Sequence, residues 1–310
     1  MTERRDKERD GRAVQTTGHS WDGDIQEYNN PLPRWWLWAF YATVVFAVIY
    51  WLIYPAWPVG AGYTKGPLGE ITYEVDGETR TSHWNTRARL LRELQSSEAA
   101  QRRRAYLERI AAAGYGDILR DPEMMDFTRS VSKGLFGDNC AACHGPGGAG
   151  RIGHYPSLVD DAWLWGGRVQ AIEETIRNGR RGFMPAFAET FDEGQLTDVA
   201  GFVLSLSGHE VAPERARRGA VIFRGEAGGC YYCHTRAGTG LASQGAADLT
   251  DGIWTAADVP GEDTLDGKLE AVKTVIREGV TREMPGWGGR LSEAEIKLLT
   301  VHVYELGAGR

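Results

Sequence analysis

The sequence predicts a mainly α-helical fold in which a single N-terminal membrane-spanning helix precedes two tandem helical domains. Three observations predict it: an uncharged apolar run near the N-terminus, a Cys-x-x-Cys-His pentad that occurs twice, and helical periodicity that recurs after each pentad. We expect an N-terminal segment at 1–34, the span at 35–54, a linker with a short hairpin and a helix at 55–122, and domains at 123–209 and 213–310.

Residues 35–54, WWLWAFYATVVFAVIYWLIY, contain no charged side chain. A helix rises ~1.5 Å per residue, so this run matches a hydrocarbon core of about 30 Å. Trp and Tyr gather at both ends of the run, as they do where a span meets the two membrane interfaces. A buried helix of a soluble protein is the alternative, and the aromatic ends favour the membrane.

Residues 1–34 are too long for the n-region of a cleavable signal peptide, and no small-residue cleavage site follows the span. We therefore expect an uncleaved anchor. The segment carries several basic residues, and basic residues beside a span favour the cytoplasmic side while acids contribute little. The prediction is a cytoplasmic N-terminus and a periplasmic C-terminal part at the bacterial inner membrane. The first twelve residues, MTERRDKERDGR, are expected to be disordered.

The linker contains Pro55, Pro58 and several glycines. Residues 71–81 alternate around Asp76-Gly77, which predicts a small hairpin. Residues 84–113 have helical periodicity and many arginines, which we interpret as a solvent-exposed face.

Two pentads use all four cysteines of the chain: Cys140 to His144, and Cys230 to His234. A C-x-x-C-H run is the attachment site of c-type haem, in which the two sulfurs bond the porphyrin and the histidine binds the iron. Thioredoxin-like dithiols and zinc sites share the C-x-x-C spacing, but neither requires the histidine. The sequence therefore predicts two covalently bound haem c groups, held by Cys140 and Cys143 and by Cys230 and Cys233, with His144 and His234 as axial ligands.

The residues after the pentads repeat. Residues 171–179 match 271–279, and Met184-Pro185 matches Met284-Pro285 at the same offset, while the pentads lie closer together. The second unit therefore holds an insertion, whose acids we expect on a surface loop at about 255–270. Each unit ends in an amphipathic helix preceded by a capping-box pattern, Asp192-x-x-Gln195 and Ser292-x-x-Glu295.

Met184 and Met284 are the candidate sixth ligands of the two irons. A lone methionine is more often core filler. The duplicated Met-Pro, each in a predicted loop downstream of a pentad, favours ligation, and a thioether suits low-spin haem iron. The remaining histidines are interpreted as surface or packing residues, including His154, which lies near the first pentad.

These features resemble a known family, the membrane-anchored dihaem subunit of the cbb3-type cytochrome c oxidases. The resemblance spans nearly the whole chain and is carried by His19-Ser20-Trp21-Asp22-Gly23, by residues 30–36, NPLPRWW, by residues 155–167, YPSLVDDAWLWGG, and by both pentads with their Met-Pro partners. It implies two class I cytochrome c-like haem domains, with His144 and Met184 on one iron and His234 and Met284 on the other. It also implies that Pro156 offers its carbonyl to the axial histidine, a place that Ala247 takes in the second unit.

The resemblance implies an electron-transfer subunit rather than an enzyme in its own right. Its expected partners are a donor cytochrome c, a monohaem cytochrome c subunit, and the haem-copper catalytic subunit that reduces oxygen and pumps protons. A net charge of −7 argues against nucleic acid. Two alternatives stay open: a freestanding membrane-anchored dihaem shuttle, and a dihaem peroxidase-like enzyme, which would need an iron with an open position.

Overall fold

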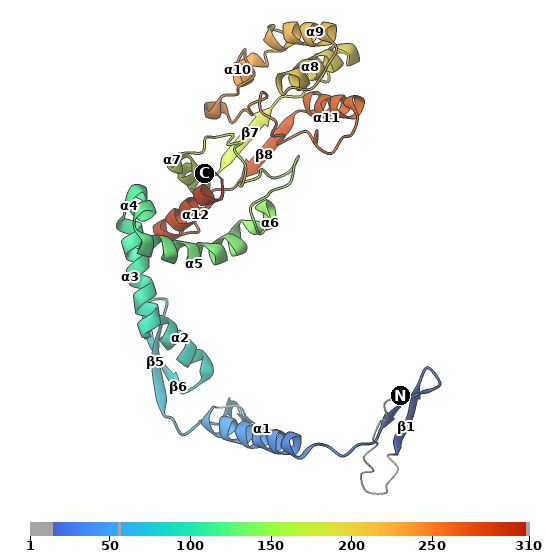
Figure 1. Ribbon diagram of the computed structural model, residues 1–310. Helices are drawn as coiled ribbons and strands as arrows, with labels where there is room; N and C mark the ends of the chain where they lie inside the picture. The colour runs from blue at the N-terminus through green and yellow to red at the C-terminus, as the bar shows by residue number, and fades with distance from the viewer. Residues whose placement is uncertain (1–14, 55–56, 308–310) are drawn as a thin grey trace. The chain divides into compact units, whose positions relative to one another are not determined.

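The computed structural model describes residues 15–54 and 57–307 and divides into two compact units, residues 1–101 and 102–310 (Figure 1). Residues 1–12, which are expected to be disordered, and Pro55 of the predicted linker lie outside the described residues.

The first unit contains the membrane-spanning candidate and three small hairpins. Its elements are β1 (Thr16–Trp21), β2 (Ile25–Tyr28), α1 (Arg34–Ile53), β3 (Pro58–Val59), β4 (Gly62–Tyr63), β5 (Glu70–Val75), β6 (Glu78–His83) and α2 (Thr86–Ser96). β1 pairs with β2, β3 with β4, and β5 with β6, all antiparallel. The β1–β2 and β3–β4 hairpins were not predicted.

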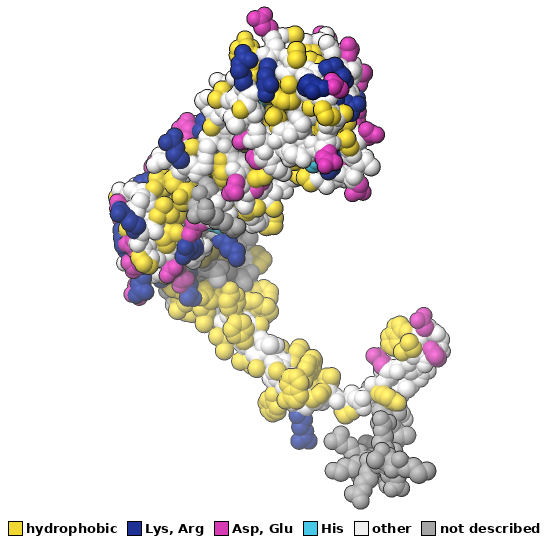
Figure 2. Space-filling model, turned by 45° about the horizontal axis from the view of Figure 1, so that its top comes forward, with side chains coloured by type: hydrophobic (Ala, Val, Ile, Leu, Met, Phe, Trp, Pro, Cys, Tyr) yellow, Lys and Arg dark blue, Asp and Glu magenta, His cyan; other side chains and the backbone are white. Residues whose placement is uncertain are grey.

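Helix α1 matches the predicted span to within one residue at each end. Within the described residues it is the one helix long and apolar enough to cross a membrane. None of its side chains is buried, and hydrophobic side chains cover it in Figure 2. An apolar helix without protein around it is what a lipid-facing segment requires.

The predicted hairpin around Asp76-Gly77 is confirmed. Asp76 and Gly77 both have positive φ, 53° and 78°, and the register pairs Val75 with Glu78. Two central residues with positive φ favour a tight hairpin turn. The predicted helix at 84–113 is instead two helices, because Ser97 is extended between α2 and α3 (Glu98–Ala112).

The second unit is mainly helical. After α3 it contains α4 (Tyr115–Arg120), α5 (Pro122–Asn139), α6 (Ala141–His144), α7 (Val169–Asn178), β7 (Arg180–Met184), α8 (Glu193–Leu206), α9 (Pro213–Arg224), α10 (Tyr231–His234), the 3-10 helix η1 (Ala242–Gln244), α11 (Leu265–Glu278), β8 (Val280–Met284) and α12 (Glu293–Leu306). Both predicted capping boxes are present, at the starts of α8 and α12.

The acidic insertion is only partly the expected surface loop. Its acids Asp258, Glu262, Asp263 and Asp266 are exposed. Ala257 and Val259, however, are buried in the core, and Thr264 caps α11, which therefore begins inside the insertion. The expectation of a loop over the whole segment was wrong because its apolar residues had a core to join.

The closing helices pack on the opposite repeat. Helix α8, which follows the first pentad, packs on α9 and α11 beside the second pentad. Helix α12, which follows the second pentad, packs on α5 and α7 beside the first. Residues 102–310 consequently form one compact unit in which the two sequence repeats are interlocked.

The α8–α9 crossing depends on a glycine. A Cβ on Gly219 would lie 1.9 Å from the carbonyl oxygen of Asp198, so no larger residue fits there. Phe202 and Phe223 pack edge to face beside the crossing, with ring centroids 5.1 Å apart. The two helices are joined by residues 207–212 alone, and such a short connection favours antiparallel neighbours.

The strands β7 and β8, one from each repeat, pair with each other. These strands pair antiparallel, with Arg180 opposite Met284, Gly182 opposite Arg282 and Met184 opposite Val280. Neither strand was predicted, because both methionines were expected in loops. The two strands form a two-stranded ribbon. It joins equivalent segments of the two repeats, which lie one hundred residues apart in the sequence.

Candidate haem sites

The first pentad bends the chain at the end of α5. Cys140 ends α5, and the single turn α6 carries Cys143 and His144. His144 is 8% exposed, and its Nδ1 lies 3.0 Å from the carbonyl oxygen of Pro156. A ring whose Nδ1–H donates to a carbonyl presents its Nε2 as the ligand atom. Gly145 follows with φ 77°, a conformation that turns the chain away from the histidine.

The second pentad repeats this geometry with two substitutions. His234 Nδ1 lies 2.9 Å from the carbonyl oxygen of Ala247, so the alanine makes the contact that Pro156 makes in the first unit. Thr235 takes the place of Gly145 with φ 63°, which costs a β-branched residue about 1–3 kcal/mol. Its Oγ1 accepts a hydrogen bond from the Thr239 backbone N–H at 3.2 Å, which offsets part of that cost.

The buried thiol of each pentad lacks the lowered pKa of a reactive redox thiol. Burial raises the pKa of the Cys140 and Cys230 thiols to about 11, whereas reactive dithiols depend on a lowered pKa. Burial also lowers the pKa of His144 and His234, which keeps both rings neutral and able to bind a metal.

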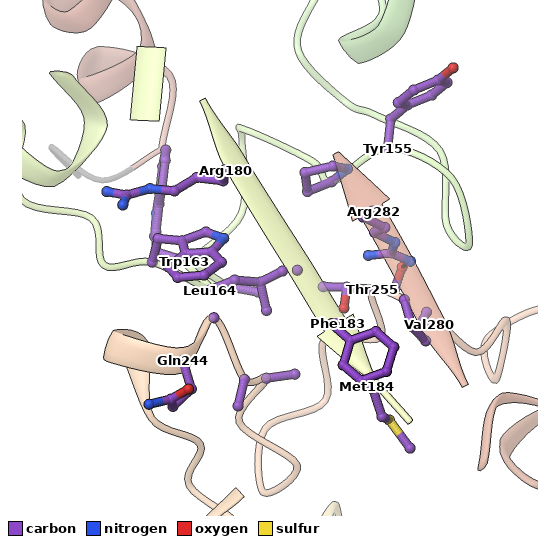
Figure 3. A pocket seen from close by; sticks show the side chains of 18 of the residues that line it. Tyr155, Trp163, Leu164, Arg180, Phe183, Met184, Gln244, Thr255, Val280 and Arg282 are labelled. Carbon is purple, nitrogen blue, oxygen red and sulfur yellow. Dashed lines mark hydrogen bonds between the residues drawn. The ribbon is translucent and has the colours of Figure 1, made fainter. Parts of the chain in front are cut away.

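A single cavity of about 860 Å³ runs past both pentads. His144 and His234 both line it, as do Met184 and Met284. Figure 3 shows β7 and β8 crossing the cavity, with Arg180 and Met184 extending from one strand and Val280 and Arg282 from the other.

The cavity wall suits a porphyrin. It is largely apolar, with Phe136, Ile172 and Ile176 beside the first pentad and Phe223 and Val272 beside the second. Two buried donors in the wall, Trp163 Nε1 and Arg282 Nε, have no partner among the residues that the structure describes. Buried donors without partners are costly, so they indicate that the occupant supplies acceptors. A flat apolar ring system with carboxylate arms meets both requirements.

Each methionine packs in a hydrophobic cluster that contains a cysteine of the other repeat's pentad. Met184 packs in the cluster that contains Phe223 and Cys230, beside the second pentad. Met284 packs in the cluster that contains Phe136 and Cys140, beside the first. The expected pairing of His144 with Met184 and of His234 with Met284 therefore differs from the packing, because the chain crosses over at β7 and β8 before each methionine is reached.

Each methionine loop is held by the helix of the other repeat. The backbone N–H groups of Trp287 and Gly288 donate to the carbonyls of Ile176 and Arg177 at the end of α7, each at 2.9 Å. Phe187 and Ala188 donate in the same way to Ile276 and Arg277 at the end of α11, at 3.1 and 3.2 Å. These four bonds attach the Met284 loop to the first repeat and the Met184 loop to the second.

Two glycines permit the close approach of these loops. Gly179 and Gly279 end α7 and α11 with φ 75° and 73°. A Cβ on Gly179 would lie 2.3 Å from the carbonyl oxygen of Met284, and one on Gly279 would lie 2.6 Å from that of Met184. The glycine of each repeat thus accommodates the methionine of the other.

Ion pairs repeat the exchange at the surface. Arg177 of α7 pairs with Glu293 of α12, at 2.5 and 2.7 Å. Arg277 of α11 pairs with Glu193 of α8, at 3.1 Å to both carboxylate oxygens. Each arginine holds the first turn of a closing helix from the other repeat. The hydrogen bonds from Arg177 lower the pKa of Glu293, and those from Lys273 and then Arg277 lower the pKa of Glu193.

The other histidines of the second unit lie at the surface or beside aromatic rings. His154 is exposed at the cavity rim and contacts the Tyr155 ring, with centroids 6.5 Å apart. His302 packs beside Phe136 at 5.1 Å, and His209 lies 6.4 Å from Trp254. Within residues 15–54 and 57–307 there is no cluster of three or more His, Cys, Asp or Glu side chains placed to hold a metal ion.

Two family models match the chain. One, described as the N-terminal domain of cytochrome oxidase-cbb3, FixP, matches residues 13–61, which include α1. The other, described as cytochrome c oxidase, cbb3-type, subunit III, matches residues 130–203 and 214–303, which include both pentads. The chain belongs to the cbb3-type oxidase subunit III family.

Curated relatives of this family match over almost their full length. A cbb3-type cytochrome c oxidase subunit FixP of Azorhizobium caulinodans is 41% identical over 306 residues, which cover 95% of this chain and 94% of the relative. A subunit CcoP of Cereibacter sphaeroides is 37% identical over 95% of both chains, and one of Rhodobacter capsulatus is 36% identical over 96% of this chain and 97% of the relative.

Membership of this family confirms several expectations. As a member of the subunit III family, the chain is a mainly helical c-type cytochrome that binds haem c. It transfers electrons within an oxidase complex and is not a catalytic enzyme itself. The apolar helix α1 supports its membrane anchor.

Sequence reasoning missed three functional features: the exchange of the closing helices, the β7–β8 ribbon, and Arg282. One signal for the exchange was available. The short connection at 207–212 places α8 next to the opening helix of the second repeat, and opening and closing helices are the ones that pack in this fold.

Proposed function

We propose that the chain carries two covalent haem c groups and passes electrons from a donor cytochrome c toward the haem-copper catalytic subunit of a cbb3-type oxidase. The observation that carries this proposal is the single cavity that runs past two pentads, each with a buried histidine oriented by a backbone carbonyl. When bound, haem supplies reversible one-electron transfer at iron.

The attachment residues in this proposal are Cys140 and Cys143 for the first haem and Cys230 and Cys233 for the second. His144 and His234 are the proximal ligands. Hydrogen bonds to Pro156 and Ala247 fix both rings, so little has to move when the charge on the iron changes.

The sixth ligands are exchanged in this proposal: Met284 for the first haem and Met184 for the second. Three observations support the exchange, namely the packing of the two methionines, the four backbone hydrogen bonds of their loops, and the two reciprocal ion pairs. Thioether ligation gives a six-coordinate iron and a higher potential than bis-histidine ligation. Filled coordination positions favour electron transfer over the peroxidase-like alternative.

The membrane arrangement in this proposal places residues 1–34 in the cytoplasm and the haem units in the periplasm, where haem attachment is completed. The charge pattern beside α1 supports this orientation. Protease added to spheroplasts tests it. Cleavage confined to residues C-terminal to α1 agrees with the proposal, and cleavage confined to the N-terminal segment contradicts it.

The complex is tested by purification of the tagged full chain from its native membrane in detergent. The proposal expects two haems per polypeptide and co-elution with a haem-copper subunit and a monohaem cytochrome c subunit. A chain that elutes with both haems but without any oxidase polypeptide would instead favour the freestanding shuttle. Rapid carbon monoxide binding to the reduced chain would contradict six-coordinate ligation.

A further inference from the structure

The centre of the β7–β8 ribbon breaks the symmetry of the repeats. Gly182 and Arg282 occupy equivalent places in the two repeats, and they are also direct cross-strand partners. Each lies two residues before a methionine, Met184 or Met284. Arg282 therefore occupies the midpoint between the two candidate haem sites, and its partner has no side chain to compete for the space.

Arg282 faces the cavity, and no anionic side chain of the described residues pairs with it. Alternate residues of both strands are partly buried, and Arg282 is on that inner face (Figure 3). One terminal nitrogen donates to the carbonyl oxygen of Thr255 at 2.7 Å, and Nε is enclosed without a partner.

Arg180 on the same inner face provides the contrast. Its Nε donates to Thr175 Oγ1 at 2.9 Å, and its guanidinium lies 5.0 Å from the centroid of the Trp165 ring. The protein itself thus accommodates Arg180. The guanidinium of Arg282 keeps an enclosed donor unused, although the cost of burying a cation falls only when an anion or acceptor is supplied.

We propose that Arg282 is a positioning residue that binds haem propionate carboxylates at the midpoint between the two sites. The proposal rests on the proposed function, since it requires bound haem. Propionates are the anions that haem brings into the cavity, and the planar guanidinium fork matches a carboxylate better than any other cation. One cation at the midpoint acts on both irons.

This role has two consequences for the haems. A buried cation opposes the extra positive charge of the oxidised iron, so Arg282 raises both potentials. It also stabilises the ionised propionate, which holds the pKa of that carboxyl below the range in which the protein works.

The test is a redox titration of the purified haem-loaded full chain, followed by absorbance at several pH values. Arg282→Gln removes the charge and keeps most of the volume. The matched control is Arg181→Gln, which removes the same charge from the adjacent exposed position of β7. Haem content and ligation are measured first, so a chain without two low-spin haems would count against the proposed function rather than against Arg282.

Arg282→Gln should lower both potentials relative to Arg181→Gln, by about tenfold in the equilibrium constant for reduction, or about 59 mV. Its potentials should also fall as pH rises from about 5 to 8, because the propionate then titrates in that range and its ionisation favours the oxidised iron. The wild-type potentials should vary less with pH.

Equal potentials and equal pH profiles in Arg282→Gln and Arg181→Gln would overturn the proposal. Should Arg282→Gln fail to accumulate, Arg282→Lys carries the test. Lysine keeps the positive charge but not the planar guanidinium fork, so we expect potentials between those of the wild type and those expected for Arg282→Gln. Potentials equal to those of the Arg181→Gln control would likewise overturn the proposal.

Discussion

Replacing Gly279 with alanine tests whether the Met184 loop is built against α11. Gly279 has φ 73° and ψ −176°, a region that glycine alone populates readily, and any other residue there costs about 1–3 kcal/mol. The added Cβ would lie 2.6 Å from the Met184 carbonyl oxygen and 2.7 Å from the Ala186 nitrogen. Moving the loop away adds about 1–3 kcal/mol.

The sum, about 2–6 kcal/mol, is a large share of a typical stability of 5–15 kcal/mol. It corresponds to a fall in melting temperature of about 5–20 °C. The assay is thermal unfolding of the haem-loaded chain in detergent, followed by far-UV circular dichroism. Gly179→Ala should behave alike, because its Cβ would lie 2.3 Å from the Met284 carbonyl oxygen.

Gly134→Ala is the matched control for this experiment. Gly134 lies in α5 with nothing within 4 Å of its added Cβ, so alanine should leave the melting temperature unchanged or raise it slightly. Equal melting temperatures for Gly279→Ala and Gly134→Ala would show that the Met184 loop does not lie against α11.

Three further predictions follow from the packing. Deleting α12, residues 293–306, should disrupt the first haem and spare the second, because α12 packs on α5 and α7. The measurement is the number of low-spin haems per chain, and loss of the second haem would contradict the exchange. Lys297→Met should lower the free energy of unfolding by about 1–3 kcal/mol in a denaturant titration. The reason is that Lys297 Nζ donates to the carbonyls of Ala111 and Ala113 at 2.6 and 2.7 Å. Lys133→Met, at an exposed position, should have no such effect. Replacing the exposed acids at 258–266 with amides should slow electron uptake from a basic donor cytochrome at low salt and weaken its salt dependence, and an unchanged rate in stopped-flow mixing would exclude steering by this segment.

The local parts of the sites followed from the sequence. A pentad places its cysteines and histidine on one helical turn whatever surrounds it, and both carbonyl contacts to the histidines formed, including the one from Ala247. The two capping boxes and the Asp76-Gly77 hairpin also depend on neighbours within a few residues, which explains why patterns of spacing located them.

The exchange of the closing helices could not be predicted from the repeat, because the two repeats carry matching residues at the contacts. Ile176 and Arg177 match Ile276 and Arg277, and Glu193 matches Glu293, so each closing segment carries the side chains to pack on either repeat. Sequence similarity cannot rank two arrangements with nearly the same contacts. The short connection at residues 207–212 was the one deciding feature that the sequence offered, whereas the pairing of β7 with β8 depends on tertiary structure.

The proposed ligation of both haems depends on each iron taking its methionine from the other repeat. A chain with Cys230 and Cys233 replaced by alanine keeps the first haem alone, and carbon monoxide binding to that reduced haem reports its sixth position. We expect rapid binding after Met284→Ala and slow binding after Met184→Ala. Rapid binding after Met184→Ala, with Met284→Ala unaffected, would contradict this ligation.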